Sequence, residues 1–221
     1  MDQPDLDPAQ HRQALLGLER INRVSRTAGR YWPEIKRLAR RVANRPVRVL
    51  DVACGGGDVV IALARIANRQ GVELQIDGCD FNPEALDHAR RQARRKEAKV
   101  GFFEIDATRD LLPECDAVLC SLFLHHLEDN QVVDLLRRMT KAARHVLQVS
   151  DLVRTPLGWA YAFAGSRLLT RSPVVHVDAP LSVGAAFSLS EAAALARRAD
   201  LNGIEIRTIF PQRFLMIWRR P

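Results

Sequence analysis

The stretch from Val47 to Val60, VRVLDVACGGGDVV, constrains the fold more than any other part of the chain. A short apolar run ends in Asp51, glycines fill positions 55–57, and Asp58 leads into the apolar-periodic segment IALARIA. Glycine takes backbone angles that side chains forbid, and it lets a ligand approach the main chain closely. The stretch therefore predicts a strand, a tight ligand-binding turn and a helix, which Asp58 caps or joins in its first turn.

Strand-like and helix-like segments alternate after this turn, and such an alternation indicates a parallel sheet. The expected strands are 47–52, 73–79, 100–104, 117–121 and 145–150. The expected helices between them are 57–69, 84–96 and 130–143. Asn82 is expected to cap the second of these helices, with Pro83 in its first turn.

Both ends of the chain depart from this alternation. Near the C-terminus, a helix from Leu189 to Ala199, capped by Ser190, precedes two apolar runs that flank Pro211-Gln212. Two strands joined by so short a link must be antiparallel. Near the N-terminus, the apolar spacing from position 9 to 45 predicts two helices, with a break at Gly29 and a new start at Trp32-Pro33.

The glycine turn does not fit a dinucleotide-binding loop well. That fingerprint requires G-x-G-x-x-G directly after the strand, and Val60 stands where the third glycine belongs. Asp51, at the strand end, would repel a diphosphate but could hold an ammonium group. A ligand with a positively charged group is therefore favoured over a dinucleotide.

At these residues the sequence resembles the class I S-adenosylmethionine (SAM) methyltransferases, whose first motif has the form hh-D-x-x-x-G-x-G. The resemblance covers about Val47 to Trp218. It implies an α/β fold with a Rossmann-like seven-stranded sheet, an antiparallel last strand, N-terminal helices and a helical lid after the fifth strand. It also implies one domain made of an N-terminal helical cap (1–46), a SAM-binding core (47–151), a substrate lid (152–189) and a C-terminal helix and hairpin (190–221). The N-terminal helices would cap the pocket or simply pack on the sheet edge.

The resemblance assigns the cofactor contacts to the tips of the strands. Asp51 would order the methionine ammonium, and Asp80, which lies 23 residues after Gly57, would accept from the ribose hydroxyls. Asp106 would accept from the adenine amine. The alternatives are that Asp80 caps a helix and that Asp106 is an acid of a solvent-facing loop. The full set of expected contacts is Asp51, Ala53, Gly55, Gly57, Asp80, Phe81, Asp106, Ala107, Ser121 and Leu122.

Histidines follow the fourth expected strand. The pair His125-His126 resembles the loop of quinone-biosynthesis and related small-molecule methyltransferases, and a histidine near neutral pKa can take a proton from a phenol. His176, which lies near Asp178 in the expected lid, is a second candidate base. A loop histidine that only packs over the cofactor is the alternative. A metal-dependent enzyme would need an acid at Ser121 to accompany Asp151, so we expect no metal.

The composition sets further limits. The net charge is +7, and arginines supply most of it, in runs that usually form solvated helix faces. The four cysteines show no metal-binding spacing, which indicates apolar packing in a reducing compartment. We expect neither a signal peptide nor a membrane-spanning helix, and hence a cytoplasmic location.

We therefore expect SAM-dependent methyl transfer, with S-adenosylhomocysteine (SAH) as the product, to a small, partly apolar acceptor. O-methylation of a phenol or polyketide-like ring suits the aromatic residues of the expected lid, and C-methylation is also compatible. The alternatives are an RNA or protein methyltransferase, suggested by the positive charge, and a non-catalytic SAM-binding protein. A nucleic-acid partner is not expected. The apolar segment 157–169, which we expect to form a helix, could contact a membrane surface or form a homodimer.

Overall fold

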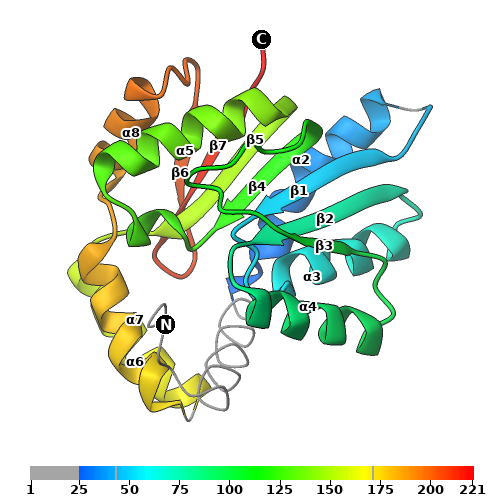
Figure 1. Ribbon diagram of the computed structural model, residues 1–221. Helices are drawn as coiled ribbons and strands as arrows, with labels where there is room; N and C mark the ends of the chain where they lie inside the picture. The colour runs from blue at the N-terminus through cyan, green and yellow to red at the C-terminus, as the bar shows by residue number, and fades with distance from the viewer. Residues whose placement is uncertain (1–24, 43, 171) are drawn as a thin grey trace.

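The computed structural model describes residues 25–42, 44–170 and 172–221, and this part of the chain contains a seven-stranded sheet in the order β3-β2-β1-β4-β5-β7-β6 (Figure 1). The strands are β1 (Val47–Val52), β2 (Leu74–Asp80), β3 (Gly101–Glu104), β4 (Cys115–Ser121), β5 (Ala143–Leu152), β6 (Glu205–Ile209) and β7 (Arg213–Arg219). The first five are parallel, and β7 is antiparallel to both of its neighbours. The predicted fold class is confirmed.

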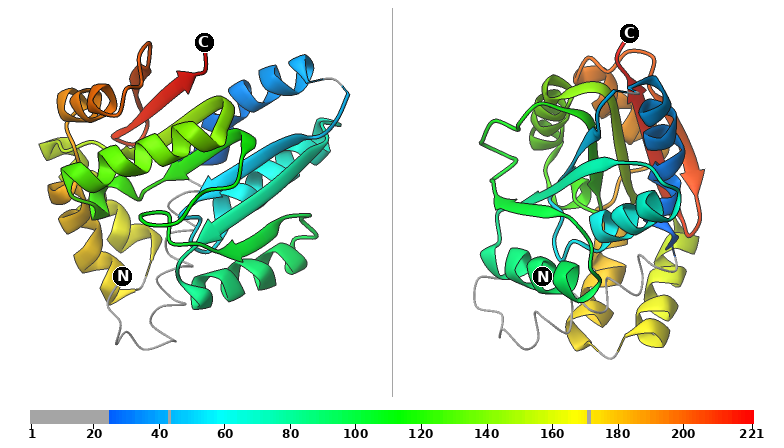
Figure 2. Two further views of the ribbon diagram at one scale, coloured as in Figure 1. Left: turned by 45° about the horizontal axis from the view of Figure 1, so that its top comes forward. Right: turned by 90° about the vertical axis from the view of Figure 1, so that its right-hand side faces the viewer.

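Helices cover both faces of the sheet (Figure 2). They are α2 (Thr27–Arg41), α3 (Asp58–Arg69), α4 (Pro83–Arg95), the short 3-10 turn η1 (Leu124–His126), α5 (Asp129–Ala142), α6 (Pro156–Leu169), α7 (Pro173–Ala185) and α8 (Leu189–Arg198). Helices α2 and α3 share one apolar core with the sheet, and α5 and α8 share the other. Because β1 and β4 are buried on both faces, they read as almost continuous apolar runs.

The N-terminal helix differs from the prediction. Helix α2 runs without interruption through Gly29, Trp32 and Pro33, so the expected break and new start are wrong. Tyr31 and Ile35, on the buried face of α2, are fully covered against the sheet, and this packing outweighs the backbone hydrogen bond that Pro33 cannot donate. Helix α2 therefore lies across a face of the sheet rather than at its edge. Most of the first expected helix, from Ala9 to the break at Gly29, lies outside the described residues.

Two other local expectations can be compared with the structure. Asn82 does cap α4, because its side chain accepts from the backbone N–H groups of Glu84 and Ala85. Ser190 does not cap α8; Ser188 does so instead, and Glu191 completes the capping box by accepting from the Ser188 backbone N–H. The serine three residues before the glutamate was the correct signal.

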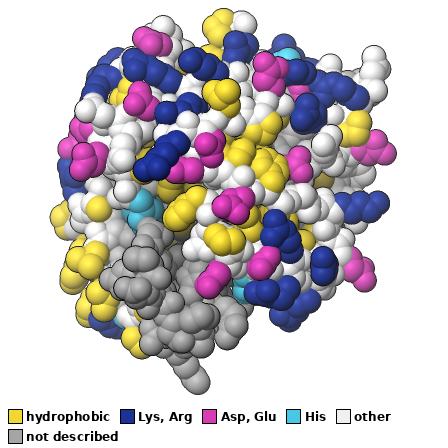
Figure 3. Space-filling model, viewed as in Figure 1, with side chains coloured by type: hydrophobic (Ala, Val, Ile, Leu, Met, Phe, Trp, Pro, Cys, Tyr) yellow, Lys and Arg dark blue, Asp and Glu magenta, His cyan; other side chains and the backbone are white. Residues whose placement is uncertain are grey.

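Two helices lie between β5 and α8, and the sequence predicted only the first of them, α6. Helix α7 begins at Pro173, is capped by Ser172 and contains Pro180. The two helices pack on each other and stand out beyond the sheet, and their apolar side chains gather at the lower left of Figure 3. The exposed apolar side chains of this pair are Leu157, Trp159, Tyr161, Phe163, Leu168, Val177 and Leu181. Among the described residues, no helix has the length and apolar character needed to cross a membrane.

The contact between α2 and the sheet yields a stability prediction. The Tyr31 hydroxyl donates to the Cys120 carbonyl oxygen at 2.7 Å, and both groups are buried. Tyr31→Phe leaves that carbonyl without its donor, which costs about 1–2 kcal/mol. We expect the Tm in thermal unfolding to fall by about 2–8 °C, since 1 kcal/mol corresponds to about 2–4 °C in a chain of this size. Tyr161→Phe, at an exposed position, is the control; equal effects of the two variants would contradict the prediction.

Candidate functional site

The carboxyl ends of the parallel strands meet where β1 lies between β2 and β4. From β1 the chain crosses to β2 and β3 on one side, whereas β4 and β5 extend the sheet on the other. Open α/β sheets bind ligands in the crevice at such a switch point. Asp51 pairs with Gly78 on one side and with Leu119 on the other, which places its carboxyl group at this crevice.

The glycine turn after β1 is shaped for close approach. Gly57 has φ +73, and a Cβ there would lie 2.8 Å from the Phe102 ring, so any other residue at this position would be strained. Gly55 also has a positive φ, but a Cβ there would meet no atom within 4 Å, so the space over it is open. Ala53, at φ 55, is a non-glycine residue in the left-handed region. Such strain commonly occurs at ligand-binding turns.

Asp51 is the most unusual group of the crevice. Its side chain is 1% exposed, and neither carboxylate oxygen has a hydrogen-bond partner among the described residues. Burial, and then the negative charges of Asp58 and Asp80, raise the pKa of this carboxyl from 3.8 to about 8. A buried acid without donors is stabilised by a proton or by a cation, so the crevice favours a positively charged group at this point.

Asp80 joins the tip of β2 to the glycine turn. One of its oxygens accepts from the Gly55 N–H at 2.8 Å, and the other accepts from the Asn82 N–H at 2.9 Å. The carboxylate therefore fixes the turn next to Asp51, and its negative charge acts on the Asp51 carboxyl group. Phe81, beside it, is 52% exposed and can pack on a flat ring.

Asp106 lies in the loop after β3. Its Oδ1 accepts from both the backbone N–H and the hydroxyl of Thr108, and its other oxygen lies 3.6 Å from Arg109 Nε. The hydrogen bonds from Thr108 lower the pKa of this carboxyl, so it is ionised and can accept a further hydrogen bond. The preceding residue, Ile105, donates its N–H to the Asp80 carbonyl, and Ala107 is buried in the core. Both roles considered for Asp106 remain compatible with this arrangement.

The tip of β4 completes the crevice. Ser121 pairs with Ser150 in the sheet, and the next residue, Leu122, has φ 55 and donates its N–H to the Ser150 carbonyl at 2.9 Å. Two strand ends of this edge thus carry a non-glycine residue with positive φ, namely Ala53 and Leu122. The backbone turns sharply at both places, which leaves its polar groups directed across the strand ends.

A buried pair of side chains lies beside this tip. His125 Nδ1 is 2.6 Å from Asp151 Oδ1, and the His125 backbone N–H donates to Asp151 Oδ2. Burial alone would raise the pKa of Asp151, but the charge and hydrogen bonds of His125 and the Leu152 N–H lower it. Because this carboxylate is ionised, the Nδ1 atom of His125 carries the hydrogen, and Nε2 is the basic nitrogen.

Sequence reasoning did not assign Asp151 this role. A signal was present, since Asp151 ends an apolar run as Asp51 and Asp80 do. Of the other two predicted bases, His126 packs its ring 4.1 Å from that of His125. His176 donates from Nε2 to the Thr170 carbonyl at 2.8 Å, which ties α7 to the end of α6. One of its two nitrogens is therefore committed to a structural contact.

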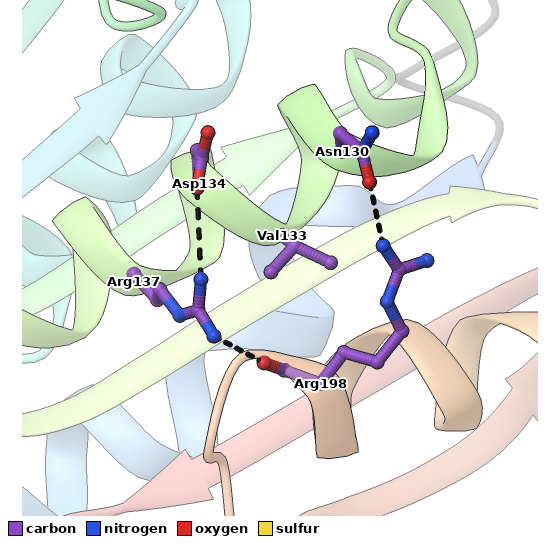
Figure 4. A pocket seen from close by; sticks show the side chains of 5 residues that line it. All are labelled: Asn130, Val133, Asp134, Arg137 and Arg198. Atoms are coloured by element: carbon purple, nitrogen blue, oxygen red, sulfur yellow. Dashed lines mark hydrogen bonds and ion pairs between the residues drawn. The ribbon is translucent and has the colours of Figure 1, made fainter.

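A surface hollow lies elsewhere on the molecule (Figure 4). It lies between α5 and α8, where Arg137 donates to the Arg198 carbonyl and Arg198 donates to Asn130. None of the predicted site residues lines it. Its own polar groups satisfy one another, so it gives no reason to move the candidate site from the strand ends. Within the described ranges, no group of three or more His, Cys, Asp or Glu side chains could hold a metal ion.

Comparison with known proteins finds similarity to methyltransferases. Residues 49–145 match a family described as a methyltransferase domain. A demethylmenaquinone methyltransferase of Deinococcus radiodurans is 36% identical over 113 residues, which cover 49% of this chain and 45% of the relative. A ubiquinone biosynthesis O-methyltransferase of Xanthomonas campestris is 31% identical over 138 residues, which cover 61% of this chain and 55% of the relative. The chain thus spans about half the length of these relatives.

A solved structure shows the same fold over nearly the whole chain. A SAM-dependent methyltransferase from Aquifex aeolicus superposes with a TM-score of 0.63 at 15% identity, covering 97% of this chain and 99% of the other. The family match and the fold agree: residues 49–145 are similar to methyltransferase domains, and the predicted resemblance to the class I SAM-dependent methyltransferases is confirmed.

The burial of Asp51 predicts an unusual dependence of stability on pH. Its pKa is raised on folding, so the folded protein holds an extra proton between about pH 4 and pH 8, and stability falls as pH rises through this range. Asp51→Asn removes the ionisable group and with it this loss of stability. In ligand-free protein we expect the Tm of the variant, relative to the Tm of wild type, to rise from pH 5 to pH 8 by at least about 3 °C. Asp87→Asn, which changes an exposed acid, is the control; a gain independent of pH would contradict the prediction.

Proposed function

We propose that this protein transfers a methyl group from SAM to a hydroxyl group of a small, partly apolar aromatic acceptor. The observation that carries the proposal is the buried Asp51 carboxyl, which has no partner among the described residues and lies at the switch point beside an open glycine turn. A sulfonium nucleoside with an amino-acid tail supplies the cation that this position favours. The similarity of residues 49–145 to methyltransferase domains supports the same cofactor.

The residues of the crevice fit the cofactor part by part. Asp51 suits the ammonium group, and Asp80 suits the two ribose hydroxyls, because a carboxylate accepts two hydrogen bonds at once. Phe81 can pack on the adenine ring, and Asp106 can accept from its amine. The carboxylates of this edge repel a diphosphate and attract a cation, which favours SAM over a dinucleotide. Gly55 leaves the main chain open to the methionine part.

The chemistry divides between cofactor and protein. SAM supplies an activated methyl group, so the protein mainly has to place the acceptor and exclude water. Asp151 holds His125 with its hydrogen on Nδ1, and Nε2 can therefore take the proton of the acceptor hydroxyl. A negatively charged oxygen is the better nucleophile, and the imidazolium that results is stabilised by the Asp151 carboxylate. We assign His125 as the general base and Asp151 as its positioning residue.

Helices α6 and α7 support the choice of an apolar acceptor. Trp159 and Phe163 stack at 5.3 Å between ring centroids, and Arg167 lies over the Phe163 ring. Helix α7 contacts η1, so this apolar pair of helices stands next to His125. The names of the two quinone-biosynthesis relatives support an aromatic acceptor with an apolar part. O-methylation suits a site with a proton acceptor, whereas C-methylation remains the alternative.

Cofactor binding tests the proposal first. We expect wild-type protein to bind SAM and SAH in calorimetric titrations, and Asp80→Ala to weaken binding by about 10- to 150-fold, because a hydrogen bond to a charged group contributes about 1.5–3 kcal/mol. Asp87→Ala, at an exposed position on α4, should bind as wild type does. Circular dichroism checks that the Asp80 variant keeps its fold, since this side chain also holds Gly55. Absence of SAM binding by wild type would end the proposal.

Turnover tests the base. With SAM and a set of phenolic and dihydroxynaphthalene acceptors, we expect His125→Gln to lower kcat by about 10²- to 10⁴-fold. Asp151→Asn should lower kcat and move the acid limb of the pH–rate profile to lower pH, because the imidazolium loses the charge that stabilises it. His176→Gln is the matched control, since its ring nitrogen bonds to a backbone carbonyl. Full activity of His125→Gln would contradict the assignment.

Other predictions from the sequence carry over as proposals. The net charge of +7 favours RNA as the alternative substrate, and RNA retention that falls steeply with salt would support it. The exposed apolar side chains of α6 would serve contact with a membrane surface or a second copy of the chain equally well. A cytoplasmic location and a reaction without metal also stay predictions. A protein that binds SAM without turning over any acceptor would fit the non-catalytic alternative.

A further inference from the structure

We propose that Asp51 keeps a proton in the ligand-free protein and releases it when the α-ammonium group of SAM or SAH enters the crevice. Binding would then exchange a proton on the carboxyl group for the positive charge of the ligand. This inference rests on the proposed function, because it concerns the same cofactor. It makes Asp51 the residue that selects for the amino-acid end of the ligand.

No described residue donates a hydrogen bond that would stabilise an ionised Asp51 carboxylate. Both carboxylate oxygens are buried, and no described donor reaches either of them. Most of the titratable groups whose charges act on Asp51 or respond to it are acidic: Asp58 on α3, Asp80 and Cys79 on β2, Cys54 in the turn, Cys120 on β4 and Tyr31 on α2. An isolated carboxylate among such groups is costly to bury, and the neutral acid costs far less.

The buried cation of this edge is engaged with other groups. Arg213 on β7 donates to the Thr27 hydroxyl at 2.9 Å. Its positive charge acts chiefly on Asp151 and Tyr31, and then on Asp58. Arg213 therefore compensates negative charge on the β5 side of the site, where Asp151 and His125 lie. The Asp51 carboxyl group on β1 is stabilised instead by a proton or by the ligand.

The ligand changes this balance. An ammonium group brings one positive charge and three N–H donors to the position that the described residues leave without a donor. The ionised carboxylate is then the favoured form, its O–H bond breaks, and the proton passes to solvent and buffer. Burial raises the pKa of Asp51 to about 8, so about nine in ten molecules carry the proton at pH 7. Below that pKa, the affinity should rise about tenfold for each pH unit.

The experiment counts protons during binding. Wild-type protein is titrated calorimetrically with SAH at pH 7 in PIPES and in imidazole, two buffers whose ionisation heats differ. The difference in binding heat gives the protons released, and we expect about 0.9 per SAH bound. The matched ligand is 5′-methylthioadenosine, which has the same nucleoside and thioether but no amino-acid tail, and we expect no release with it. The matched variant is Asp51→Asn, which should bind SAH with no dependence of the heat on the buffer.

The outcomes separate the inference from the proposed function. If SAH binds with the same heat in both buffers, the inference is overturned and SAM binding stands. If the binding of 5′-methylthioadenosine releases as many protons as the binding of SAH, the protons come from another group, and the inference is overturned as well. If neither SAM nor SAH binds, the proposed function itself fails. The two-ligand comparison uses only wild-type protein, so it remains decisive if Asp51→Asn does not fold.

Discussion

The parallel pairing of β1 between β2 and β4 is the constraint on which the rest of the structure depends. Since parallel strands end at the same edge, this pairing brings Asp51 and the neighbouring Asp80 to one crevice from positions 29 residues apart in the chain. The glycine turn can close over that edge only because Gly57 lies against the Phe102 ring, with no room for a side chain. The candidate cofactor site and the fold are therefore consequences of the same strand order.

The crevice concentrates features that weaken the folded state. Asp51 is buried without a donor among the described residues, and Ala53 and Leu122 take left-handed backbone angles next to the same strand ends. Each of these would be more stable in another form, as a neutral side chain or as glycine. Such features are expected at a preorganised ligand site, and here they occur together at one edge of a well-packed sheet.

Contacts across the chain explain where sequence reasoning fell short. The pairing of His125 with Asp151 joins the turn η1 to the end of β5, and each residue alone reads as an ordinary turn or strand-end side chain. Helix α2 continues through Pro33 because its buried face packs on the sheet, which local propensity does not register. Helix α7 was missed because Pro180 and Gly184 weaken a helical pattern that its packing on α6 maintains.

The sequence by itself determined the strands, the glycine turn and the cap at Asn82, because these depend on apolar runs and on backbone angles that few residues tolerate. It also determined which acids end the strands. Only the tertiary structure decided that the Asp51 carboxyl group has no hydrogen-bond partner among the described residues, whereas the Asp151 carboxylate accepts three hydrogen bonds. Whether a carboxylate is neutral or charged depends on the groups that surround it in space, and the order of residues along a chain does not specify those groups.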